Sequence, residues 1–373
     1  MEFSDLTTLH VGGPAPTVVT AHTQEDLVDA VSQADSSGTP LIVLGGGSNL
    51  LVSDTGFEGV VVRDGRAEIS EVDSYVSCGG STVKATGGTT WDDFVRFTLD
   101  NDLAGFEMLS GIPGTLGGAV AHNIGAYGQE ISQTLSSIRA LDRLTGRVCT
   151  LTRLDLHFSY RESIISRSRH STVAGGGRTW GPTGRWVVLE AAFQLRSADI
   201  SEPIRYESLA HSLGVNLGTR VNARRVRDHI FDRRRHQDLL PDPSNPATWS
   251  AGSFFRNPIL TETEAARLPD DTPRFPVRNE ARFVAATVNK QAPLVEGKVK
   301  IPAAWLLEQA GFPPGFRLRP NADAVLSPHY VLALTNLGEA NAAEIAELAE
   351  VVREGVRERF GITLAIQPVS VAL

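Results

Sequence analysis

The chain has 373 residues, 41% of them hydrophobic and 21% charged, which suits a folded protein of two or three domains. Its net charge of −8 argues against general affinity for nucleic acid or for an anionic membrane. Two cysteines, Cys78 and Cys149, are too few for a disulfide framework or a metal cluster, and the histidines lack metal-ligand spacing. No apolar run is long enough to span a bilayer and no export signal is recognisable, so we expect a cytoplasmic protein. We also expect a monomer.

The first half of the chain predicts mixed strands and helices. Residues 15–53 read as strand, helix, strand, in which Thr23 caps the helix and "PLIVL" is a buried strand that ends in glycines. Short strands follow, and then a helix that begins near Trp91. Residues 138–152 predict a hairpin that turns at "LTGR", and residues 185–196 predict the strand that closes this unit.

The second half predicts a smaller α+β unit. Helices are predicted over residues 223–237, 299–312 and 337–361, and strands over 330–336 and 362–371. Within the first unit, between the hairpin and its closing strand, residues 166–185 ("SRSRHSTVAGGGRTWGPTGR") lack periodicity and predict a loose loop. The predicted domains are residues 1–200, with subdomains of about 1–66 and 67–200, and residues 201–373.

A glycine-rich turn follows the first buried strand, in "LIVLGGGSNLLV". Backbone N–H groups without obstructing side chains can point at a diphosphate, although a tight structural turn would look similar. The turn is not a P-loop, which would end in Gly-Lys-Ser/Thr, and no helix follows as a Rossmann fingerprint requires. The candidate ligand-binding residues here are Gly45, Gly46, Gly47, Ser48, Asn49 and Leu50.

A second and denser stretch, "SGIPGTLGGAVAHNIGAYG", covers residues 110–128. A structural turn needs one or two glycines, so a ligand cradle is the better interpretation. A flat, extended diphosphate ligand such as FAD fits both stretches, and a nucleotide alone fits less well. The candidate residues here are Ser110, Gly111, Pro113, Gly114, Thr115, Gly117, Gly118, Asn123, Gly125 and Tyr127.

Three further stretches carry polar groups that suit a site. In "HFSYRESI", Arg161 can grip a carboxylate through paired hydrogen bonds, or form a surface ion pair. The basic run 224–237 could bind phosphate or nucleic acid, but we favour a solvated helix face. In "SAGSFFRNP", Ser253 could be a nucleophile, a proton donor or a helix cap, and the stretch alone does not decide.

Taken in order, these motifs resemble the UDP-N-acetylenolpyruvoylglucosamine reductase family over nearly the whole chain. The matching stretches are "LGGGSNLL", "GIPGTLGGAVAHNIGAYG", "FSYRES", "SAGSFFRNP" and "AAWLLEQAGF". The resemblance implies noncovalent FAD in a two-part α+β domain of the PCMH (vanillyl-alcohol-oxidase) type, followed by a smaller substrate domain. It also implies that NADPH reduces the flavin, which passes a hydride to C3 of a UDP-sugar enolpyruvyl ether before C2 is protonated.

The resemblance also implies roles for individual residues. Ser253 would protonate C2, with its two neighbouring phenylalanine rings excluding water and fixing its rotamer. Arg161 would lie over the substrate carboxylate, where charge builds in the enolate. Candidate contacts to the substrate are Tyr160, Tyr206, Asn257 and Gln309.

The chain departs from the family pattern at the last strand, where "TLAIQPV" places Gln367 at the position of a catalytic glutamate and Ile366 at that of a proline. A glutamine amide donates a hydrogen bond but does not release a proton at neutral pH. The family's lysine before "LPDP" is also missing, so His236 or an arginine would replace it, and the loop 166–185 is longer than the resemblance implies.

Three explanations of Gln367 stay open: an engineered substitution, a natural one covered by water or Arg161, or a diverged flavoprotein with another enolpyruvyl or sugar-nucleotide substrate. We rank the family's usual reaction first. The rival classes are a carbohydrate oxidase with histidine-tethered FAD, a flavin-binding protein without activity, and a nucleic-acid-binding module.

Overall fold

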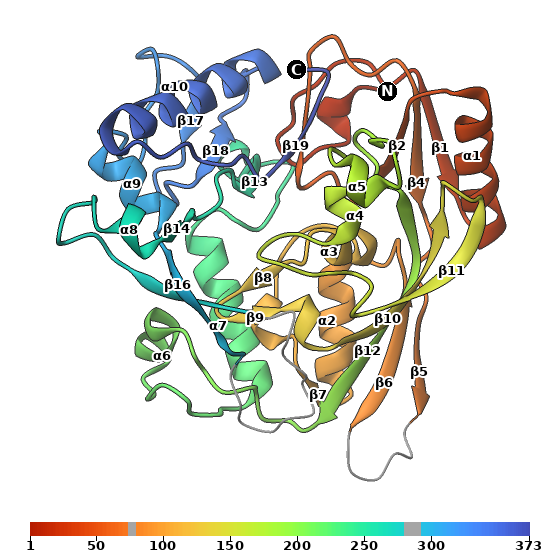
Figure 1. Ribbon diagram of the computed structural model, residues 1–373, viewed down its shortest axis with the longest axis horizontal. Coiled ribbons are helices and arrows are strands. Elements are labelled where there is room, and N and C mark those ends of the chain that lie inside the picture. Colours follow the sequence, from red (N-terminus) through yellow and green to blue (C-terminus); the bar gives the residue numbers. More distant parts are fainter. Residues whose placement is uncertain (74–79, 280–291) are drawn as a thin grey trace.

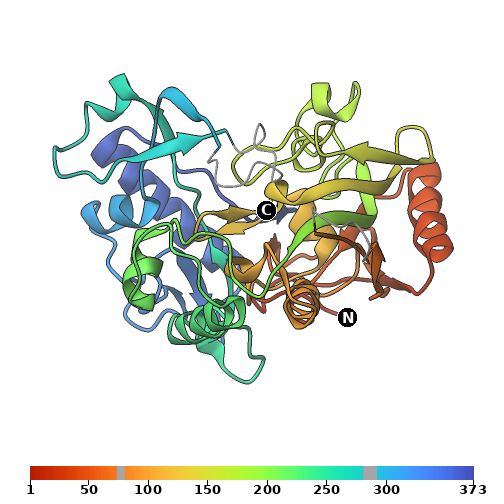
Figure 2. The same ribbon diagram turned by 90° about the horizontal axis from the view of Figure 1, so that it is seen from below.

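The computed structural model describes residues 1–73, 80–279 and 292–373 (Figure 1). Cys78 therefore lies outside the described residues, whereas Cys149 is a free thiol. Within the described ranges, no helix is long and apolar enough to cross a lipid bilayer. Viewed from below, the N-terminal half of the chain lies on the right and the C-terminal half on the left (Figure 2).

The N-terminal part builds a small parallel sheet, as the strand–helix–strand pattern predicts. Its strands run in the order β1 (Thr17–Ala21), β4 (Val60–Asp64) and β2 (Leu41–Leu44). Helix α1 (Gln24–Ser37) packs beside this sheet and begins with a capping box between Thr23 and Asp26. After the glycine turn the chain continues into strand β3 (Leu50–Val52) and not into a helix.

A larger antiparallel sheet follows, in the order β11, β10, β12, β6 and β5. The predicted hairpin is confirmed, since β10 and β11 pair from Asp142 and Arg147 outward. The helices α2 and α3 pack on this sheet through a core that includes Trp91 and Phe193. The remaining bounds of this region are β5 (Ile69–Asp73), β6 (Ser81–Thr86), α2 (Trp91–Asp100), β7 (Leu103–Ala104), α3 (Leu116–Ala121), β8 (Gly125–Ala126), β9 (Gln129–Glu130), β10 (Leu135–Asp142), β11 (Arg147–Thr152) and β12 (Trp186–Ser197).

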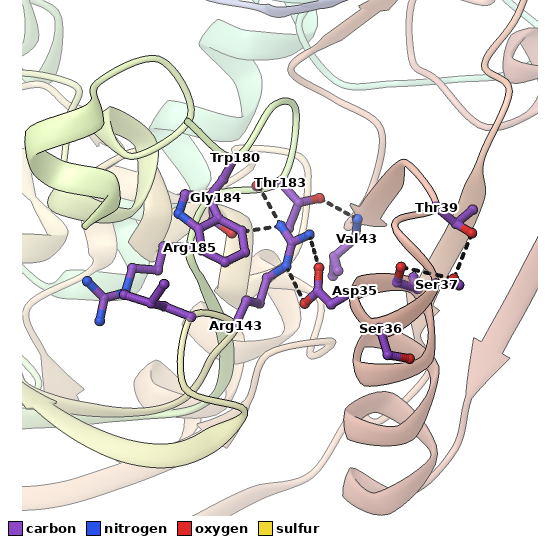
Figure 3. Close-up of polar contacts among 12 residues, drawn as sticks. Asp35, Ser36, Ser37, Thr39, Val43, Arg143, Trp180, Thr183, Gly184 and Arg185 are labelled. Carbon is purple, nitrogen blue, oxygen red and sulfur yellow. Dashed lines mark hydrogen bonds and ion pairs between the residues drawn. The ribbon is translucent and has the colours of Figure 1, made fainter. Parts of the chain in front are cut away.

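The prediction of a loose loop over residues 166–185 is wrong. The segment holds the end of α4 (Ile164–Arg167) and all of α5 (Thr172–Gly175). Arg143 forms an ion pair with Asp35 of α1 at 2.6 Å and donates to the Thr183 carbonyl at 2.9 Å (Figure 3). The Thr183 hydroxyl accepts the N–H of Val43 in β2 at 2.7 Å. Partners distant in the sequence therefore hold the segment against the small sheet.

The C-terminal part has its own core, which packs α9 (Ala303–Gln309) and α10 (Ala342–Phe360) on a three-stranded sheet. That sheet runs in the order β13, β18 and β17, and a second one in the order β14, β16 and β15. Helix α10 ends at Gly361, as predicted, because Gly361 adopts a left-handed conformation with φ of 69°. The remaining elements are α6 (Glu207–Leu213), α7 (Ala223–His236), β13 (Ser250–Ser253), β14 (Ile259–Thr261), α8 (Glu262–Ala265), β15 (Phe275–Arg278), β16 (Leu294–Lys300), β17 (Ala324–Leu326) and β18 (Ala333–Asn336).

The last strand is shorter than predicted and joins the two parts of the chain. Strand β19 covers Val369–Val371 and pairs in parallel with β3. Pro368 has no N–H to donate, and only a single bridge between Phe255 and Ile366 precedes it. The chain end thus returns to the strand that follows the first glycine turn, as Figure 1 shows.

Candidate active site

One large cavity of about 1030 Å³ brings most of the predicted site residues together. Its size is at the upper end of what a cofactor or substrate pocket occupies. The predicted residues that line it are Gly45, Gly46, Gly47, Ser48, Asn49, Leu50, Pro113, Gly114, Thr115, Gly118, Gly125, Tyr127, Tyr160, Arg161, Tyr206, Ser253, Asn257 and Gln367. Residues from both halves of the chain therefore face one shared space.

The two glycine stretches form a single wall of this cavity because they touch each other. A Cβ on Gly46 would lie 2.7 Å from the Cα of Gly114, and one on Gly45 would lie 2.5 Å from the Thr115 hydroxyl. The Ser48 hydroxyl donates to the Pro113 carbonyl at 3.0 Å. Side chains are absent here because there is no room for them, so the wall consists of exposed backbone suited to a diphosphate.

Asn49 provides a polar group that fits a cofactor. Its Nδ2 donates to the Gln367 carbonyl at 3.4 Å, whereas its buried Oδ1 accepts no hydrogen bond from the described residues. A buried acceptor without a partner is costly, and an N–H group of a bound ligand would satisfy it. The backbone wall and this acceptor together fit FAD.

Five predicted site residues do not line the cavity, namely Ser110, Gly111, Gly117, Asn123 and Gln309. Most of them make contacts that support the wall from behind. The Ser110 hydroxyl donates to the Glu107 carbonyl, the Gly111 N–H to Asp92, and the Gly117 N–H to the Gly87 carbonyl. The buried Asn123 side chain donates to Glu130 and to the Ser159 carbonyl. Gln309 ends helix α9, away from the cavity lining.

Arg161 faces the cavity from a left-handed backbone conformation, with φ of 59°. Such a conformation is uncommon for a residue other than glycine and often occurs at functional sites. Its guanidinium donates to the Gly125 carbonyl, lies 3.8 Å from a Glu130 carboxylate oxygen and sits over the Tyr160 ring at 5.0 Å. Arg161 is therefore fixed in place while it still lines the cavity.

Ser253 ends strand β13 and its hydroxyl lies 2.8 Å from the Tyr330 hydroxyl. The expectation that two phenylalanine rings flank the hydroxyl needs correction. Both phenylalanines are buried in the C-terminal core, at 0% and 1% exposure, and of these two residues only Phe255 lines the cavity. A hydrogen bond to Tyr330, and not a pair of rings, holds this serine.

The prediction of a solvated face for the basic run 224–237 holds for only part of it, since Arg224, Arg225 and Arg235 are exposed whereas other arginines turn inward. Arg227 pairs with Asp92 at 2.6 Å, and Arg233 and Arg234 line the cavity. Burial lowers the pKa of Arg234, whose enclosed Nε has no hydrogen-bond partner in the described part of the chain. Helical spacing explains this, because Arg234 lies four residues after the buried Ile230.

Aromatic and amide groups complete the C-terminal side of the cavity. The Tyr127 and Tyr206 rings meet edge-on at 5.7 Å, and Tyr206 is 48% exposed. Asn257 uses its Oδ1 to accept the Ala303 N–H at 2.8 Å at the start of α9. Gln367 is held by its backbone N–H, which donates to the Phe254 carbonyl at 2.8 Å. These contacts hold the Asn257 side chain by its amide oxygen and Gln367 by its backbone.

A buried cationic cluster adjoins the cavity at His122. Burial, followed by the charges of Arg169 and Arg256, lowers the pKa of His122 to about 3, so this imidazole is neutral at physiological pH. Burial and the neighbouring Arg256 lower the pKa of Arg169 to about 10, which still leaves it charged. Arg256 is paired with Glu162 at 2.8 Å. The sequence patterns gave no indication of this cluster.

Comparison with known proteins decides the family. Residues 15–152 match the FAD binding domain, and residues 242–371 match the C-terminal domain of UDP-N-acetylenolpyruvoylglucosamine reductase. A UDP-N-acetylenolpyruvoylglucosamine reductase from Thermobifida fusca is 41% identical over 373 residues, which cover 99% of this chain and 96% of that protein. One from Saccharopolyspora erythraea is 42% identical over 367 residues, covering 98% and 93%.

The chain belongs to the UDP-N-acetylenolpyruvoylglucosamine reductase family. The family consists of FAD-dependent oxidoreductases, and the α+β fold with an FAD-binding domain and a C-terminal domain is confirmed. The crystal structure of the reductase from Thermus caldophilus shares this fold, with a TM-score of 0.60, 23% identity and coverage of 100% of this chain and 97% of that one. The predicted domain boundaries near residues 66 and 200 stay predictions.

Proposed function

We propose that the protein reduces the enolpyruvyl ether of UDP-N-acetylglucosamine to UDP-N-acetylmuramate, with NADPH as reductant, in peptidoglycan precursor synthesis. The identity of about 40% over the whole chain to reductases with this name carries the proposal. We place this reaction in the cytoplasm. FAD, when bound, supplies hydride transfer between NADPH and C3 of the enolpyruvyl group. The glycine wall and Asn49 would hold it.

Arg161 binds the substrate carboxylate in this proposal. After C3 has received the hydride and before C2 is protonated, negative charge spreads onto the substrate carboxylate. A guanidinium that is already fixed in place stabilises this charge without reorganisation. The support is that Arg161 lines the cavity and is held by Gly125, Glu130 and Tyr160. Its ion pair with Glu130, at 3.8 Å, is long enough to leave the carboxylate-binding fork available.

Ser253 donates the proton to C2. An aliphatic hydroxyl is a weak acid, so it protonates only a strongly basic, carbanion-like carbon, which the enolate provides. Gln367 lines the same cavity, where its amide can donate a hydrogen bond but holds no proton to release at neutral pH. Of the described residues that line the cavity, Glu130 is the one with a carboxylate, and it is engaged by Asn123 and Arg161.

Product analysis tests the proposal. The purified protein, loaded with FAD, is incubated with NADPH and UDP-N-acetylglucosamine enolpyruvate, and the product is followed by mass spectrometry. We expect a product with two additional hydrogens, formed in proportion to NADPH consumed. NADPH consumption without this product would contradict the assignment and favour a diverged flavoprotein with another enolpyruvyl or sugar-nucleotide substrate.

A further inference from the structure

Tyr330 is the direct partner of the proposed proton donor. The hydroxyl oxygens of Tyr330 and Ser253 lie 2.8 Å apart, which is a normal length for a hydrogen bond between hydroxyls. Both residues line the cavity, and the Tyr330 ring is partly buried against the C-terminal core. Ser253 ends β13, whereas Tyr330 lies in the connection between β17 and β18, so the pair forms only in the folded chain.

The backbone fixes both members of this pair. Ser253 lies opposite Ala333 in the register of β13 and β18. The Ala333 N–H donates to the Tyr330 carbonyl at 2.8 Å, and the Phe254 N–H donates to the Leu332 carbonyl at 2.8 Å. These bonds fix the backbone beside both residues, so each hydroxyl is carried by an ordered segment.

We propose that Tyr330 is a positioning residue that orients the Ser253 hydroxyl and passes it a proton as Ser253 protonates C2. The inference rests on the proposed function, in which Ser253 protonates C2. As the C2–H bond forms, the Ser253 O–H bond breaks and the serine oxygen takes the proton of the Tyr330 hydroxyl. The phenolate then takes a proton from solvent, which is the one proton that the reduction consumes besides the hydride, so the step needs no oxidant or reductant of its own.

The surroundings of Tyr330 suit this role. A phenol is a stronger acid than an aliphatic hydroxyl, so it can reprotonate a serine oxygen. Burial raises the pKa of Tyr330, while the bond to Ser253 and the charge of Arg234 oppose that rise. Tyr330 therefore stays protonated at neutral pH, and the half-buried guanidinium of Arg234 is placed to stabilise a transient phenolate. The other titratable groups that face Tyr330 are Tyr127 and Tyr206.

The inference also accounts for Gln367. An amide at that position does not supply a proton, so a chain that catalyses the reaction needs another donor near Ser253. Tyr330 is the group that the structure places in direct contact with the serine hydroxyl.

Substitution of Tyr330 by phenylalanine tests the inference, because the ring stays and the hydroxyl is lost. In an anaerobic single turnover, NADPH still bleaches the flavin of Tyr330→Phe, but reoxidation by UDP-N-acetylglucosamine enolpyruvate slows by about 10²-fold. Adding Tyr330→Phe to Ser253→Ala causes no further slowing, since there is no hydroxyl left to position. We also expect the solvent isotope effect on the reoxidation rate to be larger in the wild type, where two protons move, than in Tyr330→Phe, where only one moves.

Thr335→Val is the matched control, because it removes a hydroxyl from β18 outside the cavity, and we expect wild-type reoxidation. Wild-type reoxidation in Tyr330→Phe, equal heavy-water effects, or additive slowing in the double variant would each overturn the inference and leave the proposed function intact. If the substrate fails to reoxidise the wild-type flavin at all, the proposed function fails, and the inference with it.

Discussion

Gly46 lies so close to Gly114 that position 46 has no room for a side chain, since a Cβ there would lie 2.7 Å from the Gly114 Cα. The contact joins the turn after β2 to the loop before α3, and both line the cavity. Each glycine stretch is thus shaped by the other. Glycine at these positions serves both the close backbone approach and the exposed N–H groups that a diphosphate needs.

We therefore expect Gly46→Ala to weaken FAD binding. The added carbon must push the two stretches apart, because its nearest neighbour is backbone and cannot rotate away. The purified variant should contain less FAD per chain than the wild type, measured from the ratio of flavin to protein absorbance. Gly355→Ala is the control, because its Cβ would meet the Phe312 ring in the C-terminal core. That variant should lower the melting temperature yet retain its FAD, and equal FAD content in both variants would contradict the account.

Replacing Arg161 by methionine should slow the chemical step. The loss of a fixed charge over the enolate carboxylate is worth about 3–4 kcal/mol, or about 10²–10³-fold in kcat. Arg161→Lys should recover part of the rate, because it restores the charge without the planar fork. Steady-state kinetics measure both variants. Arg319→Met, which removes an exposed ion pair with Glu347, should leave kcat unchanged. A change confined to KM in Arg161→Met would show that Arg161 only binds substrate.

Changing Gln367 to glutamate should raise turnover on the enolpyruvyl sugar. The change supplies an ionisable proton donor in the cavity at nearly constant side-chain volume. The gain is expected in flavin reoxidation and not in flavin reduction, and stopped-flow absorbance separates the two. Gln33→Glu on the exposed face of α1 controls for the added charge. An unchanged or lower reoxidation rate in Gln367→Glu would count against the usual reaction of the family.

His122 should make the protein less stable in mild acid. Its pKa is about 3 in the folded chain and 6.5 in the unfolded one, so the unfolded chain binds more protons between these values. The free energy of unfolding is therefore unaffected by His122 well above pH 6.5, and it decreases as the pH falls from 6.5 toward 3. Between pH 7 and 5 the loss is about 1–2 kcal/mol.

Urea unfolding with saturating FAD at pH 7 and pH 5 checks this expectation. His122→Gln should reduce the difference in the free energy of unfolding between the two pH values. His22→Gln, at an exposed position, should retain the wild-type difference. The same pH dependence in His122→Gln and the wild type would contradict the assignment.

Sequence motifs singled out the glycine stretches, Arg161 and Ser253, which the structure places around one cavity, whereas the roles of Arg161 and Ser253 come from the family resemblance and stay proposals. Glycines that follow a buried strand indicate backbone exposed to a ligand, and the ordered motifs indicated one family. Arg234 could have been identified as well. Ala223, Val226 and Ile230 form the buried face of α7, and the same spacing reaches Arg234.

Other features depend on contacts between distant parts of the chain and leave no local pattern. Tyr330 precedes an ordinary strand, and its meeting with Ser253 requires the pairing of β13 with β18. The segment 166–185 appears irregular in sequence, yet Arg143 and Asp35 help to hold it in place. Sequence periodicity describes one element at a time, so such contacts appear only once the elements are assembled.

Anaerobic flavin absorbance, compared between the wild type and Ser253→Ala, tests the central claim most directly. NADPH is added first, and UDP-N-acetylglucosamine enolpyruvate second. We predict that NADPH bleaches both proteins and that the substrate quickly restores the colour of the wild type only. Equal recovery of colour in Ser253→Ala would contradict the proton-donor role, and no recovery in the wild type would contradict the proposed function itself.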